Sequence, residues 1–143
     1  MKKAAVCLLA LLLLGGCQAK ERIEMDIPGN KTVTFVNAVR DADAWILPQT
    51  AANLKTTMWG AATVPKARMG ESREVPLGEA GDGGLYIFRM IDVDGFFYSA
   101  NGIVLEDGWR VTIKGDDLQE ISIEISNEDG VLQKIFEVFS ARL

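Results

Sequence analysis

The chain has 143 residues, 24% of them charged and none of them histidine, with a formal net charge of -5 at pH 7. The length fits a single domain, and the lack of histidine excludes Ser-His-Asp and Cys-His catalysis and argues against a zinc or copper site. An acidic surface repels phosphate backbones, so we expect no nucleic-acid partner.

The first residues have the features of a secretory signal. Lys2 and Lys3 precede an uninterrupted apolar run from Ala4 to Leu14. A membrane-spanning helix needs about 20 apolar residues, so this run is too short to span a bilayer. It is typical of the apolar region of a signal peptide, which is removed and plays no part in the fold.

The end of the apolar run, Leu14-Gly15-Gly16-Cys17, resembles the lipobox of bacterial lipoproteins. The resemblance implies cleavage before Cys17 and lipidation of Cys17, and Gln18 in place of Asp implies transfer to the outer membrane. Several acyl chains would hold the protein stably on a leaflet. The alternative is an ordinary cleaved signal with a chance cysteine. We therefore predict a signal peptide over residues 1–16, a lipidated tether over 17–31 and a folded domain over 32–143.

Signal removal also changes the charge and the thiol content of the chain. Loss of Lys2 and Lys3 takes the net charge from -5 to -7. Cys7 leaves with the signal and Cys17 carries the lipid, so we expect no disulfide, thiolate metal site or cysteine nucleophile in the folded part.

Alternating apolar residues predict strands through most of the folded part, with turn signals every 8 to 12 residues in its second half. The clearest example is Ile121, Ile123 and Ile125, which alternate with polar residues. Residues 49–60 are the one place where a helical turn fits. The expected strands are 32–39, 45–47, 73–77, 85–93, 96–100, 102–105, 109–114, 120–126 and 132–139.

The segment 85–93 is the strongest of these strands. Tyr86, Phe88 and Met90 share one side, and Ile87 and Ile91 lie on the other. Both faces are largely apolar, which is typical of a central strand that is covered on both sides or flanked by a loop.

Asp92-Val93-Asp94-Gly95 follows that strand and allows two interpretations. Two carboxylates and a glycine suggest calcium, but an EF-hand loop has its glycine at position 6, whereas here glycine is fourth. Asp-Gly between two strands favours a tight hairpin of type I′. We prefer the hairpin. A calcium site would require Asp92 and Asp94 to meet a second acidic loop that contains Asp116 and Asp117. That second loop is otherwise a solvated turn.

Three tryptophans are candidates for contact with a ligand or partner. Trp45 and Trp109 fall in predicted strands, where core packing is the commoner role of tryptophan. Trp59 precedes Gly60 in a predicted loop. We therefore expect Trp59 to be the exposed tryptophan that contacts a ligand or partner.

The order of several short motifs resembles small secreted bacterial modules of uncharacterised function. The motifs are Trp59-Gly60, Gly84-Leu85-Tyr86-Ile87, Asp92-Val93-Asp94-Gly95 and Asp107-Gly108-Trp109, within residues 32–118. The resemblance implies a β-sandwich and no known activity. The strands after Glu120 would add a hairpin to one sheet.

We therefore predict an all-β, antiparallel sandwich of about seven to nine strands. The leading functional hypothesis is a non-enzymatic outer-membrane lipoprotein that contacts the membrane through Cys17 and binds a protein partner in the cell envelope. The alternative is a small ligand-binding or inhibitor module, with calcium as an optional cofactor. A carboxylate-based hydrolase is a third hypothesis, but no residue pair is singled out for it.

Overall fold

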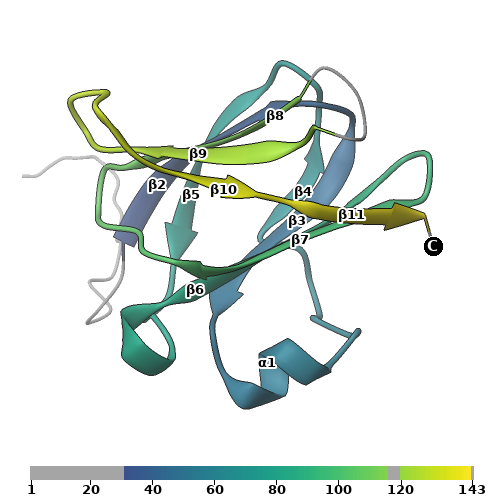
Figure 1. The fold of residues 1–143 in the computed structure, drawn as a ribbon, viewed down its shortest axis with the longest axis horizontal. Coiled ribbons are helices and arrows are strands. Elements are labelled where there is room, and N and C mark those ends of the chain that lie inside the picture. The colour runs from purple at the N-terminus through teal and green to yellow at the C-terminus, as the bar shows by residue number, and fades with distance from the viewer. Residues whose placement is uncertain (1–30, 116–119, 143) are drawn as a thin grey trace, which may run out of the picture.

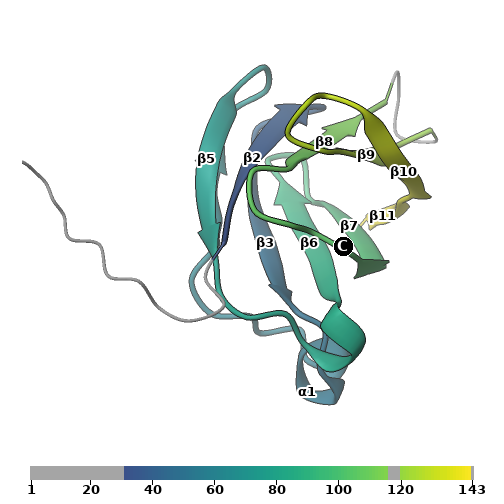
Figure 2. The same ribbon diagram turned by 90° about the vertical axis from the view of Figure 1, so that its left-hand side faces the viewer.

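Ten strands in the described part of the chain form two five-stranded sheets that pack face to face (Figures 1 and 2). The computed structural model describes residues 31–115 and 120–142. Sheet 1 has the strand order β10-β9-β8-β2-β5, and sheet 2 has the order β11-β7-β6-β3-β4. The strands are β2 (Lys31–Ala38), β3 (Ala42–Pro48), β4 (Val64–Ala67), β5 (Ser72–Leu77), β6 (Tyr86–Asp92), β7 (Phe96–Ile103), β8 (Arg110–Lys114), β9 (Ser122–Ser126), β10 (Leu132–Glu137) and β11 (Phe139–Arg142).

Two short helical segments complete the described fold. Helix α1 (Ala51–Lys55) begins after Thr50, whose Oγ1 accepts a hydrogen bond from the Asn53 N–H at 3.0 Å. This side-chain cap satisfies a donor that the first helical turn leaves free. The second segment, η2 (Asp82–Gly84), is a single turn. Neither these nor any other described segment is a helix long and apolar enough to cross a membrane.

The core lies between the sheets and is built from the inward residues of each alternating strand. Phe35 of sheet 1 and Phe88 of sheet 2 stack across the interface, with ring centroids 6.0 Å apart. Aromatic pairs at this separation add about 0.5–1.5 kcal/mol to the stability gained by burial alone. The predicted sandwich class is therefore confirmed. Other fully buried core residues are Val33, Met90, Ile103, Leu105, Ile113, Ile123 and Ile125.

The prediction of a wholly antiparallel sheet is wrong at one pair of strands. β2 runs parallel to β8, with Phe35 opposite Val111, while every other strand pair is antiparallel. The first described strand, β2, therefore lies inside sheet 1, between β8 and β5. The described strands also number ten instead of seven to nine.

The structure differs from the predicted strands in several places. β4 was not predicted; it contains Pro65, and proline within a sheet is largely confined to edge strands such as this one. The two strands predicted on either side of Asn101 are one strand, β7, bent where Gly102 has φ +73°. The closing strand predicted over residues 132–139 is instead two strands in different sheets. β10 pairs with β9 and β11 pairs with β7, so the C-terminal segment crosses from sheet 1 to sheet 2 at Val138.

The hairpin between β6 and β7 is confirmed, but its turn is not of type I′. The Gly95 N–H donates to the Asp92 carbonyl at 3.1 Å, and Gly95 has φ +85°. Type I′ would also require positive φ at the residue before the glycine, and Asp94 has none. A three-residue loop with only its last residue at positive φ is the next commonest hairpin connection. The predicted turn at Asn127–Gly130 has the same arrangement.

Side chains join the two sheets along the β4–β5 side of the sandwich. Asn37 of sheet 1 is fully buried, and its Nδ2 donates to the Ala67 carbonyl of sheet 2 at 3.0 Å. Arg73 Nη1 reaches from β5 to the Pro65 carbonyl at 2.7 Å. These bonds give two carbonyl groups of β4 side-chain donors from sheet 1, and so they tie the two sheets together on this side of the molecule.

Candidate functional site

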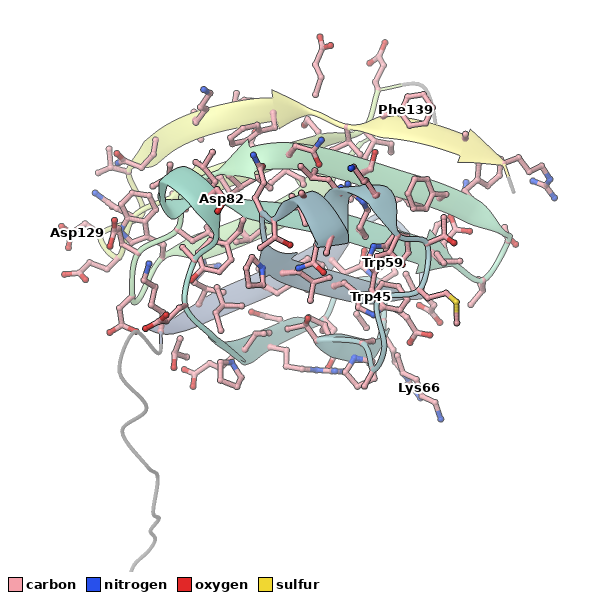
Figure 3. All side chains as sticks on the ribbon, turned by 90° about the horizontal axis from the view of Figure 1, so that it is seen from below. Trp45, Trp59, Lys66, Asp82, Asp129 and Phe139 are labelled. Carbon is pink, nitrogen blue, oxygen red and sulfur yellow. The ribbon has the colours of Figure 1, made fainter. Side chains whose placement is uncertain are left out.

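The outer face of sheet 2 carries a cluster of three aromatic side chains. Trp45 projects outward from β3, because its neighbours Ala44 and Ile46 point into the core. The Trp59 ring lies 5.4 Å from the Trp45 ring and 5.8 Å from the Phe97 ring, stacking almost parallel to the latter at 11°. Figure 3 shows Trp45 and Trp59 next to each other, close to α1. The loop after α1 therefore covers this face of the sheet with an indole.

Two strongly exposed apolar side chains border the cluster. Met58 precedes Trp59 and is 85% exposed, and Phe139 is 63% exposed. Phe139 pairs with Ser99, which lies on the same side of β7 as Phe97, so Phe139 is a diagonal cross-strand neighbour of Phe97. We call these five residues the aromatic face; its members are Trp45, Met58, Trp59, Phe97 and Phe139.

The outer face of sheet 1 has a different character. Its outward positions include Thr34, Thr112 and Glu124, and Lys114 forms an ion pair with Glu124 at 2.9 Å. Most of this face is suited to solvent, although Ile135 of β10, opposite Glu124, is also exposed on it. The aromatic side chains of the cluster lie on the outer face of sheet 2.

Trp59 lies in a loop, as predicted, but its side chain is less exposed than expected. Trp59 is half-buried, because Trp45 and Phe97 pack against it. Its Nε1 is buried and has no hydrogen-bond acceptor among the described residues, whereas Trp45 Nε1 donates to the Gly60 carbonyl at 3.1 Å. Trp109 lies apart from the cluster and packs against the core.

A buried arginine lies in the sheet beside the aromatic cluster. Arg89 pairs with Trp45 on one side and Ser99 on the other, and it is only 6% exposed. Its Nη1 donates to Asn101 Oδ1 at 2.8 Å and to the Phe88 and Ala100 carbonyls. Desolvation lowers the pKa of Arg89. The bond to Ala100 satisfies a carbonyl next to the bend in β7, which gives Arg89 a structural role.

The structure brings Asp92 and Asp94 together at the β6–β7 turn, but other groups already engage them. Asp92 Oδ1 accepts the N–H groups of Asp94 and Phe96, both at 2.9 Å, and Oδ2 accepts the Tyr98 hydroxyl at 2.6 Å. Arg40 lies 3.1 Å from Asp94 Oδ2 and 3.8 Å from Asp92 Oδ2. Burial, followed by the bond to Asp92, raises the pKa of Tyr98.

This arrangement favours the turn over the calcium interpretation. A calcium ion needs six to eight oxygen ligands, and the oxygens of Asp92 are taken up by three hydrogen-bond donors. The described ranges hold no group of three or more carboxylate or other ligating side chains placed to bind a metal. Asp116 and Asp117, the other half of the predicted site, lie outside the described residues, as does Cys17.

A hollow of about 380 Å³ lies beside the β3–β4 edge of sheet 2. Asp43, Ile91 and Lys66 contribute to its wall. Lys66 has φ +52° and is the only described residue other than glycine with a positive φ. The Lys66 N–H donates to Asp43 Oδ1 at 2.7 Å, which holds this strained backbone in place. The Lys66 side chain extends away from the body of the protein (Figure 3).

Comparisons of the chain with protein-family models, with curated proteins and with solved structures find no match. The candidate site therefore rests on the geometry alone.

Proposed function

We propose that this protein is a lipid-anchored, non-enzymatic binding module of a bacterial outer membrane, and that its aromatic face binds a protein partner in the cell envelope. The aromatic face carries the proposal. Aromatic side chains and methionine are enriched at the centres of protein interfaces. Tryptophan combines a large apolar ring with one hydrogen-bond donor, and methionine has a flexible side chain that adapts to a partner's surface. The outer face of sheet 1 has no comparable aromatic cluster among the described residues, which supports the assignment to the outer face of sheet 2.

The packing of the cluster supports an anchor role for Trp59. Trp45 and Phe97 hold the indole between them, so little side-chain freedom remains to be lost on binding. Met58 is free to adapt its shape at the border. The net charge of -7 after signal removal favours a partner with a basic rim, because complementary charge speeds encounter.

The sequence supports the location of the binding module. The lipobox at Leu14–Cys17 gives an anchor, and residues 18–30 give the domain a tether of up to about 40 Å when extended. The first described strand, β2, begins at Lys31. A module on such a tether samples partners near the membrane, where confinement raises their effective concentration.

In-cell crosslinking of the full-length protein, followed by mass spectrometry, tests the proposal. Met58→Glu and Phe139→Glu each place a charge on the aromatic face without touching the core, and Met69→Glu is the matched control at a residue that is 64% exposed in the β4–β5 turn. We expect one dominant envelope protein to be crosslinked in the wild type and in Met69→Glu, and to be lost in both face variants. Cys17→Ala should lose it as well if anchoring is needed.

Equal crosslinking in all of these variants would refute the aromatic face as the binding surface. The second candidate, a small-ligand module, is favoured by the hollow beside Lys66. Backbone strain of this kind gathers at functional sites. A chain that crosslinks to no protein, but whose amide signals around Asp43 and Ile91 shift on adding a small ligand, would support that alternative.

A further inference from the structure

The edges of the two sheets are protected unequally. Among the described strands, two in each sheet have one side without a neighbour: β10 and β5 in sheet 1, and β11 and β4 in sheet 2. β4 contains Pro65 and the bulge at Lys66, and β5 contains Pro76. Proline, bulges and charges are the common means by which proteins prevent a sheet edge from pairing with another chain. The β4 and β5 edges are therefore guarded.

The β10 edge has a bulge between Leu132 and Lys134 and two charged residues, Lys134 and Glu137, but it has no proline. It differs from the β4 and β5 edges in the apolar side chains that it exposes. Nine large hydrophobic residues are exposed in the described chain, and four of them fall within residues 131–139. Three lie along or beside β10: Val131 is 57% exposed, Leu132 50% and Ile135 52%. Figure 1 shows β10 and β11 as one continuous band across the front of the sandwich. This edge has the features of a pairing site.

The backbone of β10 shows which groups are available for pairing. The Val138 N–H donates to the Ile121 carbonyl beside β9. Backbone groups alternate in direction along a strand, so Phe136 also faces β9, while Ile135 and Glu137 direct their N–H and C=O groups to the open side. No strand in the described part of the chain pairs with these groups, so they are available to a second strand.

We propose that β10 pairs with β10 of a second copy of this chain, antiparallel and about a two-fold axis at Ile135, which joins two copies of sheet 1 into one ten-stranded sheet. The edge is self-complementary about that axis. Ile135 meets its own copy, Lys134 falls opposite Phe136, and Glu137 falls beside the neutral Gln133. Within one chain Lys134 Nζ already lies 5.2 Å from the Phe136 ring. No like charges stand directly opposite each other, which would oppose pairing.

The expected dimer is weak in solution. β10 has six residues, and an edge of that length buries less surface than a standard protein interface. Tethering two copies to one membrane raises their effective concentration and compensates for this weakness. The inference does not depend on the aromatic face, which lies on the outer side of the other sheet.

Sedimentation velocity of the chain Gln18–Leu143 tests the proposal. The core residues that the structure describes run from Val33 to Val138, and this chain retains all of them. Over roughly 1 to 500 µM we expect a reversible monomer–dimer equilibrium. Glu137→Pro removes an N–H that faces the open side and should make the protein monomeric with an unchanged circular dichroism spectrum. Ile135→Lys, which leaves the backbone intact and places like charges on the axis, should do the same.

A disulfide experiment provides a second readout that does not depend on affinity. The chain from Gln18 onward contains no cysteine, so any disulfide formed by one introduced cysteine must join two copies. Ile135→Cys should form a covalent dimer under mild oxidation at least tenfold faster than Val93→Cys, a control that is 74% exposed in the β6–β7 turn. A monomer at every concentration, a dimer that survives Glu137→Pro, or equal oxidation at residues 135 and 93 would overturn the proposal.

Discussion

Replacing Asp92 tests whether the β6–β7 turn is a structural device or half of a calcium site. Asp92 accepts three hydrogen bonds, two from the backbone of its own turn and one from the Tyr98 hydroxyl. The turn at Asn127 offers a natural comparison. There Asn127 Oδ1 accepts the N–H groups of Asp129 and Val131, so an amide performs the same backbone task. Asp92→Asn should therefore keep the turn, and Asp92→Ala should lose it.

The magnitudes follow from the bonds that each variant removes. Asp92→Asn keeps both bonds to Oδ1 and exchanges a charge-assisted bond to Tyr98 for a neutral one, a difference of about 1–2 kcal/mol. Asp92→Ala removes all three bonds and leaves the buried Tyr98 hydroxyl without its acceptor, a loss of about 3–5 kcal/mol. At about 4 °C per kcal/mol for a domain of this size, Tm should fall by about 4–8 °C and about 12–20 °C, respectively.

Thermal unfolding followed by circular dichroism measures these shifts, with and without millimolar calcium. Asn127→Ala is the control for loss of an exposed turn acceptor, and its Tm should fall by less than that of Asp92→Ala. The turn interpretation predicts no effect of calcium on any variant. Equal damage from Asp92→Asn and Asp92→Ala, or a wild-type Tm that rises with calcium and no longer does so in Asp92→Asn, would refute the structural role that we assign to Asp92.

Three further predictions concern backbone conformation and pH. Gly95→Val should cost about 1–2 kcal/mol in urea unfolding because Gly95 has φ +85°; Gly78→Val, at an open position without positive φ, should cost far less, and equal costs would contradict the turn geometry. Lys66→Gly should raise stability by up to about 1 kcal/mol by relieving the strain at φ +52°; a loss would show that Lys66 is not strained. Because burial raises the pKa of Tyr98 and of Tyr86 above the value of 10.0 expected in the unfolded chain, their contribution to stability is complete below about pH 10 and is lost as pH rises further. Urea midpoints measured from pH 8 to 11 should fall only at the alkaline end, and less steeply in Tyr98→Phe.

Local patterns predicted most of the elements and few of their partners. The alternation around Phe88 and Ile123 identified strands and their buried faces, because side-chain direction depends only on neighbouring residues. The pairing of β2 with β8 joins Phe35 to Val111, and no local signal reports a partner so distant in sequence. The sequence also gives no sign that the predicted strand 132–139 divides at Val138 into β10 and β11. The alternation of inward and outward residues continues through Val138, although the backbone passes from one sheet to the other.

Local sequence also predicts the members of the candidate site better than their contacts. The position of Trp59 before Gly60 in a predicted loop indicates one member of the aromatic face. Its packing against Trp45 and Phe97 depends on how β3, β7 and the loop after α1 meet in space. Phe97 carried one usable signal: in an alternating strand beside the buried Tyr98 it must point outward, where a large aromatic residue is unusual.

The closure of both sheets by the C-terminal segment has a consequence for the order of folding. β2 is the first described strand, yet its parallel neighbour β8 begins only at Arg110, and Val138, between β10 and β11, is part of the core. Sheet 1 therefore cannot be completed until residues from the two ends of the described chain have come together. Long-range pairing of this kind delays folding.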